Sequence, residues 1–272
     1  MRNRRVAGAG HILKTIYMPK TCPLIVFSDL DGTLLDHASY DWSAAQPMIE
    51  RLKALNAPLV LASSKTGPEI AALQSQMGLS HWPAIIENGA GLLGDSSPSH
   101  YTRLLETLNK TDPKLRAQFT GFGDMSAQEV ADCTGLALED ANRAKARAFP
   151  EPGIWAGGDD AQDSFIAELA RYGITARAGG RFLTLSFGKT KADQMADIIA
   201  RFCPRHTIAL GDAPNDIEML EAADFGVIIA NPHRPALPPL AGETSGRIRR
   251  SQDAGPLGWN TTLSNLLDQL DL

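Results

Sequence analysis

The stretch "LIVFSDLDGTLLD", residues 24–36, places an uninterrupted apolar run directly before two aspartates. Residues 24–27 have the character of a parallel strand that is covered on both faces. Asp29 and Asp31 follow, two positions apart, and the chain then turns at Gly32-Thr33. Taken alone, this is an acidic turn after a strand. The alternative is that a positive charge lies between two carboxylates that would otherwise repel each other.

Strand and helix patterns alternate on the C-terminal side of this stretch and again near the end of the chain, which predicts right-handed crossovers and an open parallel sheet. Further strands are predicted at residues 57–63, 84–93 (with a break at Asn88-Gly89), 207–212 and 225–231. Helices are predicted at residues 43–56, 66–79, 191–202, 215–223 and 261–272. The fold class is therefore α/β, with a Rossmann-like core formed by residues 21–94 and 189–272.

The segment of residues 95–188, called the insert below, has a different pattern. Short helices are predicted within residues 120–136 and 138–149, a strand at 153–157 and a helix at 159–173, and 174–179 and 181–188 form a hairpin across Gly179-Gly180. This composition predicts a smaller α+β cap domain inserted into the core. A ligand is then expected in the crevice between the two parts.

Composition excludes several classes of function. The formal net charge of −5 provides no basic field for nucleic acid. The three cysteines are scattered and fit neither a disulfide framework nor a zinc site, which favours a reducing cytoplasm. No run of about 18 apolar residues is present, so no membrane span is expected. The basic residues 1–20 contain no continuous apolar region and are interpreted as a flexible leader rather than a targeting segment.

Four polar clusters follow predicted strands or open predicted helices of the core, where ligands of open parallel sheets bind. They are Asp29/Asp31/Thr33, Ser63-Ser64-Lys65, Lys189 or Lys191, and the group Asp212, Asn215 and Asp216 in "GDAPND". Each has a structural explanation by itself, as a turn, a helix cap or a solvated helix face. Their joint occurrence in this order favours one shared site.

A phosphoryl-transfer site explains why these residue types would be needed together. Three converging carboxylates, Asp29, Asp31 and Asp212, require a hard cation, and Mg²⁺ prefers such oxygen ligands and also binds phosphate. Asp29 could then attack phosphorus as a nucleophile, while Asp31 protonates the leaving oxygen and later deprotonates water. The Ser63 hydroxyl and a lysine ammonium would hold the other phosphate oxygens.

These motifs together resemble the haloacid dehalogenase superfamily of aspartate-nucleophile phosphatases. The resemblance spans nearly the whole chain, and the insert with "IIENGA" is similar to the branch with the larger α/β cap. Aligning Lys191-Ala192 with that branch's usual Lys-Gly step implies that Lys191 is the motif lysine, with Lys189 in reserve. It also implies that Thr33, Asn215 and Asp216 lie next to the metal ligands.

A narrower resemblance concerns the mannosyl-3-phosphoglycerate phosphatase family. It rests on "LLDHASYDWSAAQP", "SSKT", "IIENGAG", "MSAQEVADCTGL", "RAFPEP" and "GGRF". It implies a small-molecule phosphorylated glycosyl acid as the substrate and mannosylglycerate as the product. The chain departs from the family after Arg147 and at Leu183-Thr184, where that family usually has a Glu and a His, so the glycosyl group stays open.

Such a substrate carries a carboxylate as well as a phosphate, so a second cationic anchor is expected. The candidates are Arg147 and Arg181 in the insert and Lys65 beside Ser63, each of which could instead be a surface residue. Sugar hydroxyls would be met by the loop containing Ser64 and by the turn of Glu87, Asn88 and Gly89, which could equally be structural.

Three rival functions follow from the same residues. The first is a binding protein without catalytic activity, against which every expected acidic position is filled. The two others are active. One is a phosphatase that acts on another sugar phosphate. The other is a signalling module in which a phosphorylated aspartate switches a conformation; Asp31 and the large insert argue against it, because a receiver module has neither.

Overall fold

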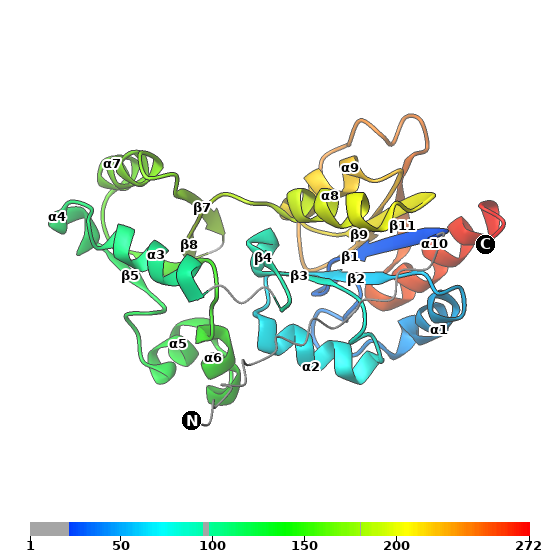
Figure 1. Ribbon diagram of the computed structural model, residues 1–272, viewed down its shortest axis with the longest axis horizontal. Helices are drawn as coiled ribbons and strands as arrows, with labels where there is room; N and C mark the ends of the chain where they lie inside the picture. The colour runs from blue at the N-terminus through cyan, green and yellow to red at the C-terminus, as the bar shows by residue number, and fades with distance from the viewer. Residues whose placement is uncertain (1–21, 95–97, 180) are drawn as a thin grey trace, which may run out of the picture.

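The computed structural model describes residues 22–94, 98–179 and 181–272, which form two groups of secondary structure elements (Figure 1). The leader predicted for residues 1–20 lies outside the described residues. No helix in the described ranges combines the length and the apolar character needed to cross a membrane.

The larger group is built on a seven-stranded sheet in the order β11-β10-β9-β1-β2-β3-β4. All neighbouring strands are parallel except β3 and β4. The strands are β1 (Leu24–Ser28), β2 (Leu59–Ala62), β3 (Ala84–Ile86), β4 (Gly91–Leu92), β9 (His206–Gly211), β10 (Phe225–Ala230) and β11 (Ile248–Ala254). Ser28 is in register with both Leu61 and Leu210, so β1, β2 and β9 end at the same edge. The predicted α/β fold with a parallel core sheet is confirmed.

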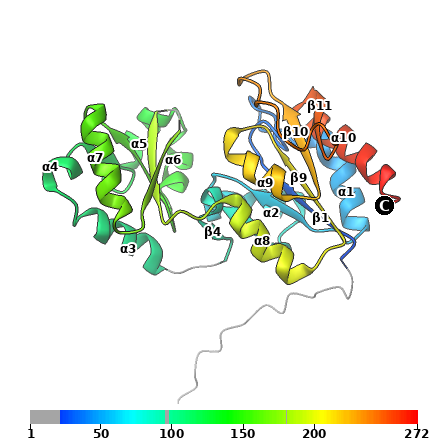
Figure 2. The same ribbon diagram turned by 90° about the horizontal axis from the view of Figure 1, so that it is seen from above.

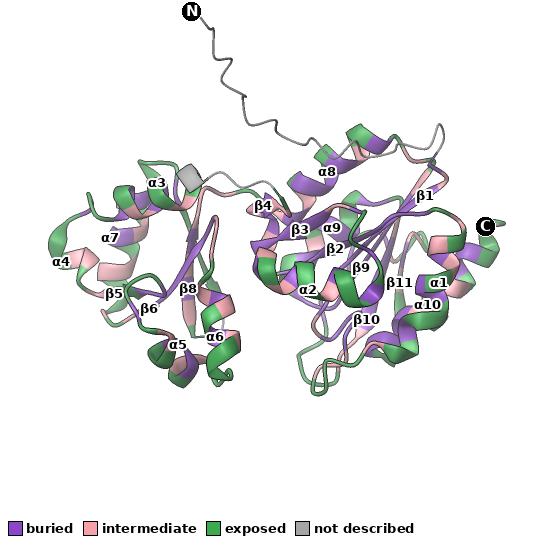
Figure 3. Cartoon of the chain, turned by 60° about the horizontal axis from the view of Figure 1, so that its bottom comes forward, coloured by how far each residue is buried: buried purple, intermediate pink, exposed green. Residues whose placement is uncertain are grey.

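Helices cover both faces of this sheet. Helices α8 (Lys191–Phe202) and α9 (Ile217–Ala222) lie on one face, and α1 (Gln46–Ala54), α2 (Gly67–Met77) and α10 (Gly255–Gln269) lie on the other (Figure 1). Because both faces are covered, every residue of β1 is buried (Figure 3). The buried Trp259 of α10 donates from its indole nitrogen to the Ser28 hydroxyl at 2.9 Å, which ties α10 to the end of β1.

The smaller group is built on a four-stranded antiparallel sheet in the order β5-β6-β8-β7. Its strands are β5 (Phe119–Gly121), β6 (Glu151–Trp155), β7 (Thr175–Gly179) and β8 (Phe182–Ser186). Its helices are α3 (Pro98–Leu108), α4 (Pro113–Arg116), α5 (Ala127–Thr134), α6 (Leu138–Lys145) and α7 (Asp159–Ala170). All of these elements come from the insert, and they stand apart from the seven-stranded sheet in both views (Figure 2).

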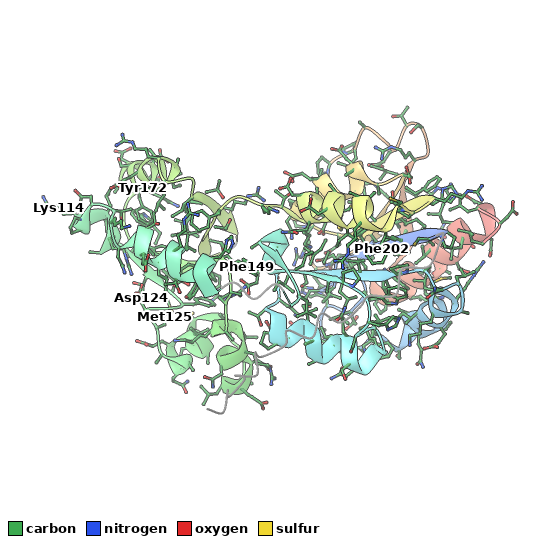
Figure 4. The ribbon with its side chains drawn as sticks, viewed as in Figure 1. Lys114, Asp124, Met125, Phe149, Tyr172 and Phe202 are labelled. Carbon is green, nitrogen blue, oxygen red and sulfur yellow. The ribbon has the colours of Figure 1, made fainter. Side chains whose placement is uncertain are left out.

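One side chain of the insert belongs to the core instead. Phe149 is buried in the apolar cluster of the larger group and lies between the two groups of elements (Figure 4). Its ring packs so closely on Gly91 that a Cβ at that glycine would lie 2.2 Å from it. The insert is therefore attached to the core at a third point, in addition to the two chain crossings.

Several predicted elements differ from the structure. Helix α10 begins at residue 255, whereas a start at residue 261 was predicted. The prediction was late because "GPLGW" has the composition of a turn, although proline is favoured in the first turn of a helix. Strand β11 was not predicted because an edge strand with the sequence "IRRSQDA" is mostly polar. Helix α3 was not predicted, and β5 occupies residues assigned in part to a helix. Strand β6 begins two residues before the predicted start.

Candidate active site

The parallel register brings the predicted polar clusters to one edge of the large sheet. Asp29 follows β1, Ser63 follows β2, and Asp212 follows β9. Lys191 begins α8, which is capped by Thr190: the Thr190 hydroxyl accepts from the Asp193 amide, and the Asp193 carboxylate accepts from the Thr190 amide. This reciprocal cap fixes where the helix starts and hence where Lys191 points.

Three buried carboxylates meet at this edge. Asp29, Asp212 and Asp216 each offer an oxygen, and these oxygens lie within 4.8 Å of one another. Asp216 is fully buried, and its Oδ2 accepts from the amides of Asp212 and Ala213. The predicted pair Asp29 and Asp212 is thus brought together, with Asp216 rather than Asp31 as the third carboxylate.

Lys191 lies among these carboxylates, whereas Lys189 does not. Lys191 Nζ donates to Asp29 Oδ1 at 2.6 Å and to Asp216 Oδ1 at 2.7 Å, and its side chain is 1% exposed. Burial alone would lower the pKa of this ammonium, but the charges of Asp216 and Asp29 outweigh burial and raise it. Lys189 is 56% exposed and faces Asp197 at 3.4 Å. The geometry therefore selects Lys191.

The carboxylate of Asp212 is held from two sides. Thr33 donates from its hydroxyl to Oδ1 at 3.0 Å, and Asn231 donates from its side-chain amide to Oδ2 at 2.7 Å. Burial raises the pKa of Asp212, and the negative charge of Asp29 raises it further, against these hydrogen bonds. Gly32 is required here, because its φ is +86° and a Cβ would lie 2.3 Å from the Asn231 amide nitrogen.

Asn231 was missed in the sequence analysis, as was Arg234, whose Nε lies 3.7 Å from Asp212 Oδ2. A signal for Asn231 was present. It is the first polar residue after β10, the same position relative to a strand that Asp29, Ser63 and Asp212 occupy.

The cluster of three carboxylates (Asp29, Asp212 and Asp216) has the type of donor atoms that Mg²⁺ prefers. They are all carboxylate oxygens, and the three buried carboxylates outnumber the two cationic side chains that face them, Lys191 and Arg234. A divalent cation between Asp29 and Asp212 would relieve the repulsion that raises the pKa of Asp212.

Asp31 points to a different partner. Lys65 Nζ lies 2.9 Å from both oxygens of its carboxylate and 5.0 Å from the centre of the Tyr40 ring. Burial lowers the pKa of Lys65, but the charge and the hydrogen bond of Asp31, together with the charge of Glu69, outweigh burial and raise it.

The loop after β2 is joined to the turn after β3 by backbone hydrogen bonds. The Glu87 amide donates to the Lys65 carbonyl at 3.0 Å, and the Asn88 amide donates to the Ser63 carbonyl at 2.8 Å. Ser63 is buried, and its hydroxyl accepts from the Lys65 amide at 3.2 Å. Asn88 also accepts from the Asn215 side chain at 3.0 Å, which connects this turn to the loop of Asp212.

Glu87 and Arg147 connect the site to the insert. The buried Glu87 carboxylate accepts from the amides of Ala148 and Phe149 at 3.0 and 3.1 Å, and burial raises its pKa. Arg147 donates to the carbonyl of Ser64, whose side chain is exposed, at 3.1 Å. These contacts favour a positioning role for Glu87 over the predicted contact with sugar. Arg181, by contrast, is exposed and is bound within the insert, to the Cys133 carbonyl at 2.6 Å.

Gly89 lets the turn after β3 approach Lys191. Its φ is +92°, and a Cβ would lie 2.0 Å from the Thr190 carbonyl carbon, directly before Lys191. We expect Gly89→Ala to lower the free energy of unfolding by more than the roughly 1–3 kcal/mol of left-handed strain alone, and to reduce any activity. Urea denaturation measures the first effect. Gly94→Ala is the matched control, since its φ is +93° and none of the described residues has an atom within 4 Å of the added Cβ; equal losses in both variants would contradict the argument.

Several solved structures have a fold similar to that of this chain. Solved structures with a similar fold include the sucrose-phosphatase from Synechocystis sp. PCC6803, at 17% identity and a TM-score of 0.59, covering 92% of this chain and 99% of that one. Another is a phosphatase of the haloalkanoate superfamily from Bacteroides thetaiotaomicron, at 15% identity and a TM-score of 0.61, covering 96% and 98%. A third is a subclass IIB sugar phosphatase, at 15% identity and a TM-score of 0.58, covering 91% and 98%.

At these identities the solved structures show a shared fold. A family model described as haloacid dehalogenase-like hydrolase matches residues 26–110 and 181–238, which include all three carboxylates of the cluster and Lys191. The chain therefore belongs to the family of haloacid dehalogenase-like hydrolases.

Proposed function

We propose that this protein is a Mg²⁺-dependent phosphatase that forms an aspartyl-phosphate on Asp29. The observation that carries the proposal is the buried group in which Lys191 holds Asp29 beside Asp212 at the end of the parallel strands. Lys191 occupies Oδ1 of Asp29, which leaves Oδ2 as the oxygen that attacks phosphorus.

The residues divide the reaction into two steps. In the first, an oxygen of Asp29 bonds to phosphorus, the ester bond to the leaving oxygen breaks, and Asp31 gives that oxygen a proton. In the second, Asp31 takes a proton from water as the water oxygen bonds to phosphorus, and the Asp29 carboxylate is released. Ser63 and Lys191 hold the non-bridging oxygens of the phosphoryl group while it is transferred.

Asp29 and Asp212 would hold the metal ion. Asp216 would support them, since it accepts hydrogen bonds from Lys191 and from the Asp212 amide. When bound, Mg²⁺ supplies the positive charge that lets a phosphate dianion approach these carboxylates. Asp31 was predicted as a metal ligand through its carboxylate, but that carboxylate pairs with Lys65 and is not part of the carboxylate cluster. We therefore assign Asp31 the proton transfer and not the binding of the metal ion.

The substrate we propose is mannosyl-3-phosphoglycerate or a similar glycosyl-3-phosphoglycerate, which would yield the glycosylglycerate and phosphate. The motifs of the narrower family resemblance support it. So does Arg147, which lies against the loop of Ser64 and could bind the second acidic group. The insert, taken as a cap domain of residues 95–188, would close over the substrate and exclude water. Another sugar phosphate is the alternative, favoured by the similar fold of the sucrose-phosphatase and the subclass IIB sugar phosphatase.

Phosphate release from a panel of esters, with and without Mg²⁺, tests the proposal. The panel contains mannosyl-3-phosphoglycerate, 3-phosphoglycerate, glucose 6-phosphate, sucrose phosphate and p-nitrophenyl phosphate. We expect the glycosyl phosphoglycerate to have the highest kcat/KM, and chelation to abolish turnover until Mg²⁺ is restored. Preference for a sugar phosphate would support the alternative substrate class. A long-lived phosphoprotein without turnover would instead indicate a signalling module.

A further inference from the structure

The loop after β2, residues 63–66, is bonded to the turn after β3. The Asn88 amide donates to the Ser63 carbonyl at 2.8 Å, and the Glu87 amide donates to the Lys65 carbonyl at 3.0 Å. The Ser63 amide donates in turn to the Ile85 carbonyl of β3 at 3.0 Å. The loop and the turn therefore form one bonded unit.

The other two residues of the loop contact the insert. Arg147 donates to the Ser64 carbonyl at 3.1 Å, and the Thr66 hydroxyl lies 3.2 Å from the carbonyl oxygen of Arg143. Arg143 belongs to the last turn of α6, and Arg147 follows that helix. The loop thus meets the turn and the insert at alternate positions along its length. The insert cannot leave the core at this point without breaking contacts to the loop.

Glu87 is bonded to both the loop and the insert. Its amide belongs to the loop contact, while its carboxylate accepts from the amides of Ala148 and Phe149 at 3.0 and 3.1 Å. Glu87 is 2% exposed, and the Phe149 ring packs in the apolar cluster of the core (Figure 4). Backbone N–H groups at a buried junction need acceptors, and a carboxylate provides one oxygen for each of these two amides.

The backbone of the turn is strained at this residue. Glu87 and Asn88 have left-handed φ values of +52° and +59°. Residues other than glycine adopt this conformation at a cost, where their surroundings enforce it. In this conformation the Glu87 amide faces the loop while its carboxylate reaches the insert. A glycine would adopt the same φ without the strain but would provide no carboxylate, so the strain indicates a role for the side chain.

We propose that Glu87 is a positioning residue that couples the insert to the loop of Ser63, so that binding of residues 147–149 to the core holds this loop in place. The coupling follows from contacts that do not involve the reaction. Its consequence for the Ser63 hydroxyl, which would hold phosphate, rests on the proposed function. Glu87 thereby has a role other than contact with a sugar.

Backbone hydrogen exchange, measured at single residues by NMR on the full chain without substrate, tests the coupling. Glu87→Gln keeps the shape of the side chain but turns an NH₂ group toward one of the two amides. We expect the Ala148 and Phe149 amides to exchange faster by a factor on the order of 10 or more, as for the loss of a hydrogen bond to a charged acceptor. The Lys65 and Asn88 amides, which both donate to Ser63, should exchange faster with them. The amides of β1 should keep their wild-type rates.

Glu151→Gln is the matched control. Glu151 is also a buried glutamate, and its carboxylate accepts from the Gly123 amide at 2.7 Å, within the insert. This variant should accelerate exchange at Gly123 and leave Lys65 and Asn88 at wild-type rates. Acceleration at Lys65 and Asn88 in the control as well would overturn the inference.

Two results with Glu87→Gln would also overturn it. One is acceleration confined to Ala148 and Phe149, and the other is an equal acceleration in β1, which would indicate a general loss of stability. If Glu87→Gln does not fold, Arg147→Met decides, since it removes the contact of the insert with the Ser64 carbonyl. It should accelerate exchange in the loop after β2, and unchanged rates there would contradict the coupling. Wild-type protein that hydrolyses no ester would instead contradict the proposed function and leave the exchange result standing, so the two failures are distinguishable.

Discussion

Asp29→Asn is expected to reduce phosphate release from the best ester of the panel by a factor on the order of 10⁴ or more, the loss typical of removing a nucleophile. The side-chain amide cannot form an acyl phosphate. It is close to the carboxylate in shape, and its oxygen can still accept from Lys191 Nζ, so the core should stay folded. Steady-state phosphate release with Mg²⁺ present measures the effect, and the thermal unfolding midpoint verifies the fold.

A second readout identifies the nucleophile directly. Acid-quenched wild-type protein should carry phosphate on the peptide that contains Asp29, and the variant should carry none. Asp197→Asn is the matched control, because Asp197 belongs to a surface pair with Lys189 and should retain full activity. Near wild-type hydrolysis by Asp29→Asn would show that another group attacks phosphorus.

The predictable parts of the fold were the strands that are buried on both faces of the sheet and the helices whose ends are marked by proline or glycine. The apolar runs of β1 and β2 and the proline and glycine that bound α2 all lie where the pattern placed them. The edge strand β11 was missed, because it is half exposed and its polar sequence has no strand period that distinguishes it from a loop. The chain boundaries of the insert and the roles of the site residues stay predictions.

The site was predictable where a single rule applied, namely that polar residues after parallel strands share one edge. That rule identified Asp29, Ser63 and Asp212. Applied to β10, it would also have identified Asn231. It could not assign partners. Pairing Asp31 with Lys65 depends on the conformations of two loops, and the contact of Glu87 with the insert depends on a left-handed turn with a φ of +52°. Neither follows from spacing along the chain.

Lys191→Met is expected to lower both stability and activity. The change removes an ammonium that is 1% exposed and leaves the carboxylates of Asp29 and Asp216 buried without it. Breaking a buried pair in this way costs about 3–5 kcal/mol of unfolding free energy. Loss of a charge that holds phosphate oxygens should lower kcat by about 10²–10³-fold. Urea denaturation and phosphate release measure the two effects, with metal present in both.

Lys189→Met tests which of the two lysines, Lys189 or Lys191, acts in the reaction, a choice that the sequence left open. Its ammonium is over half exposed and faces Asp197 at 3.4 Å, a distance and a setting at which solvent screens the pair. Both stability and kcat should therefore stay at wild-type values. Stability and kcat need to be measured together, since a surface lysine could affect substrate capture without affecting the free energy of unfolding. The opposite result would be a large loss of kcat in Lys189→Met and little change of kcat in Lys191→Met. It would mean that α8 moves when substrate binds, and that Lys191 stabilises the folded core but takes no part in the reaction.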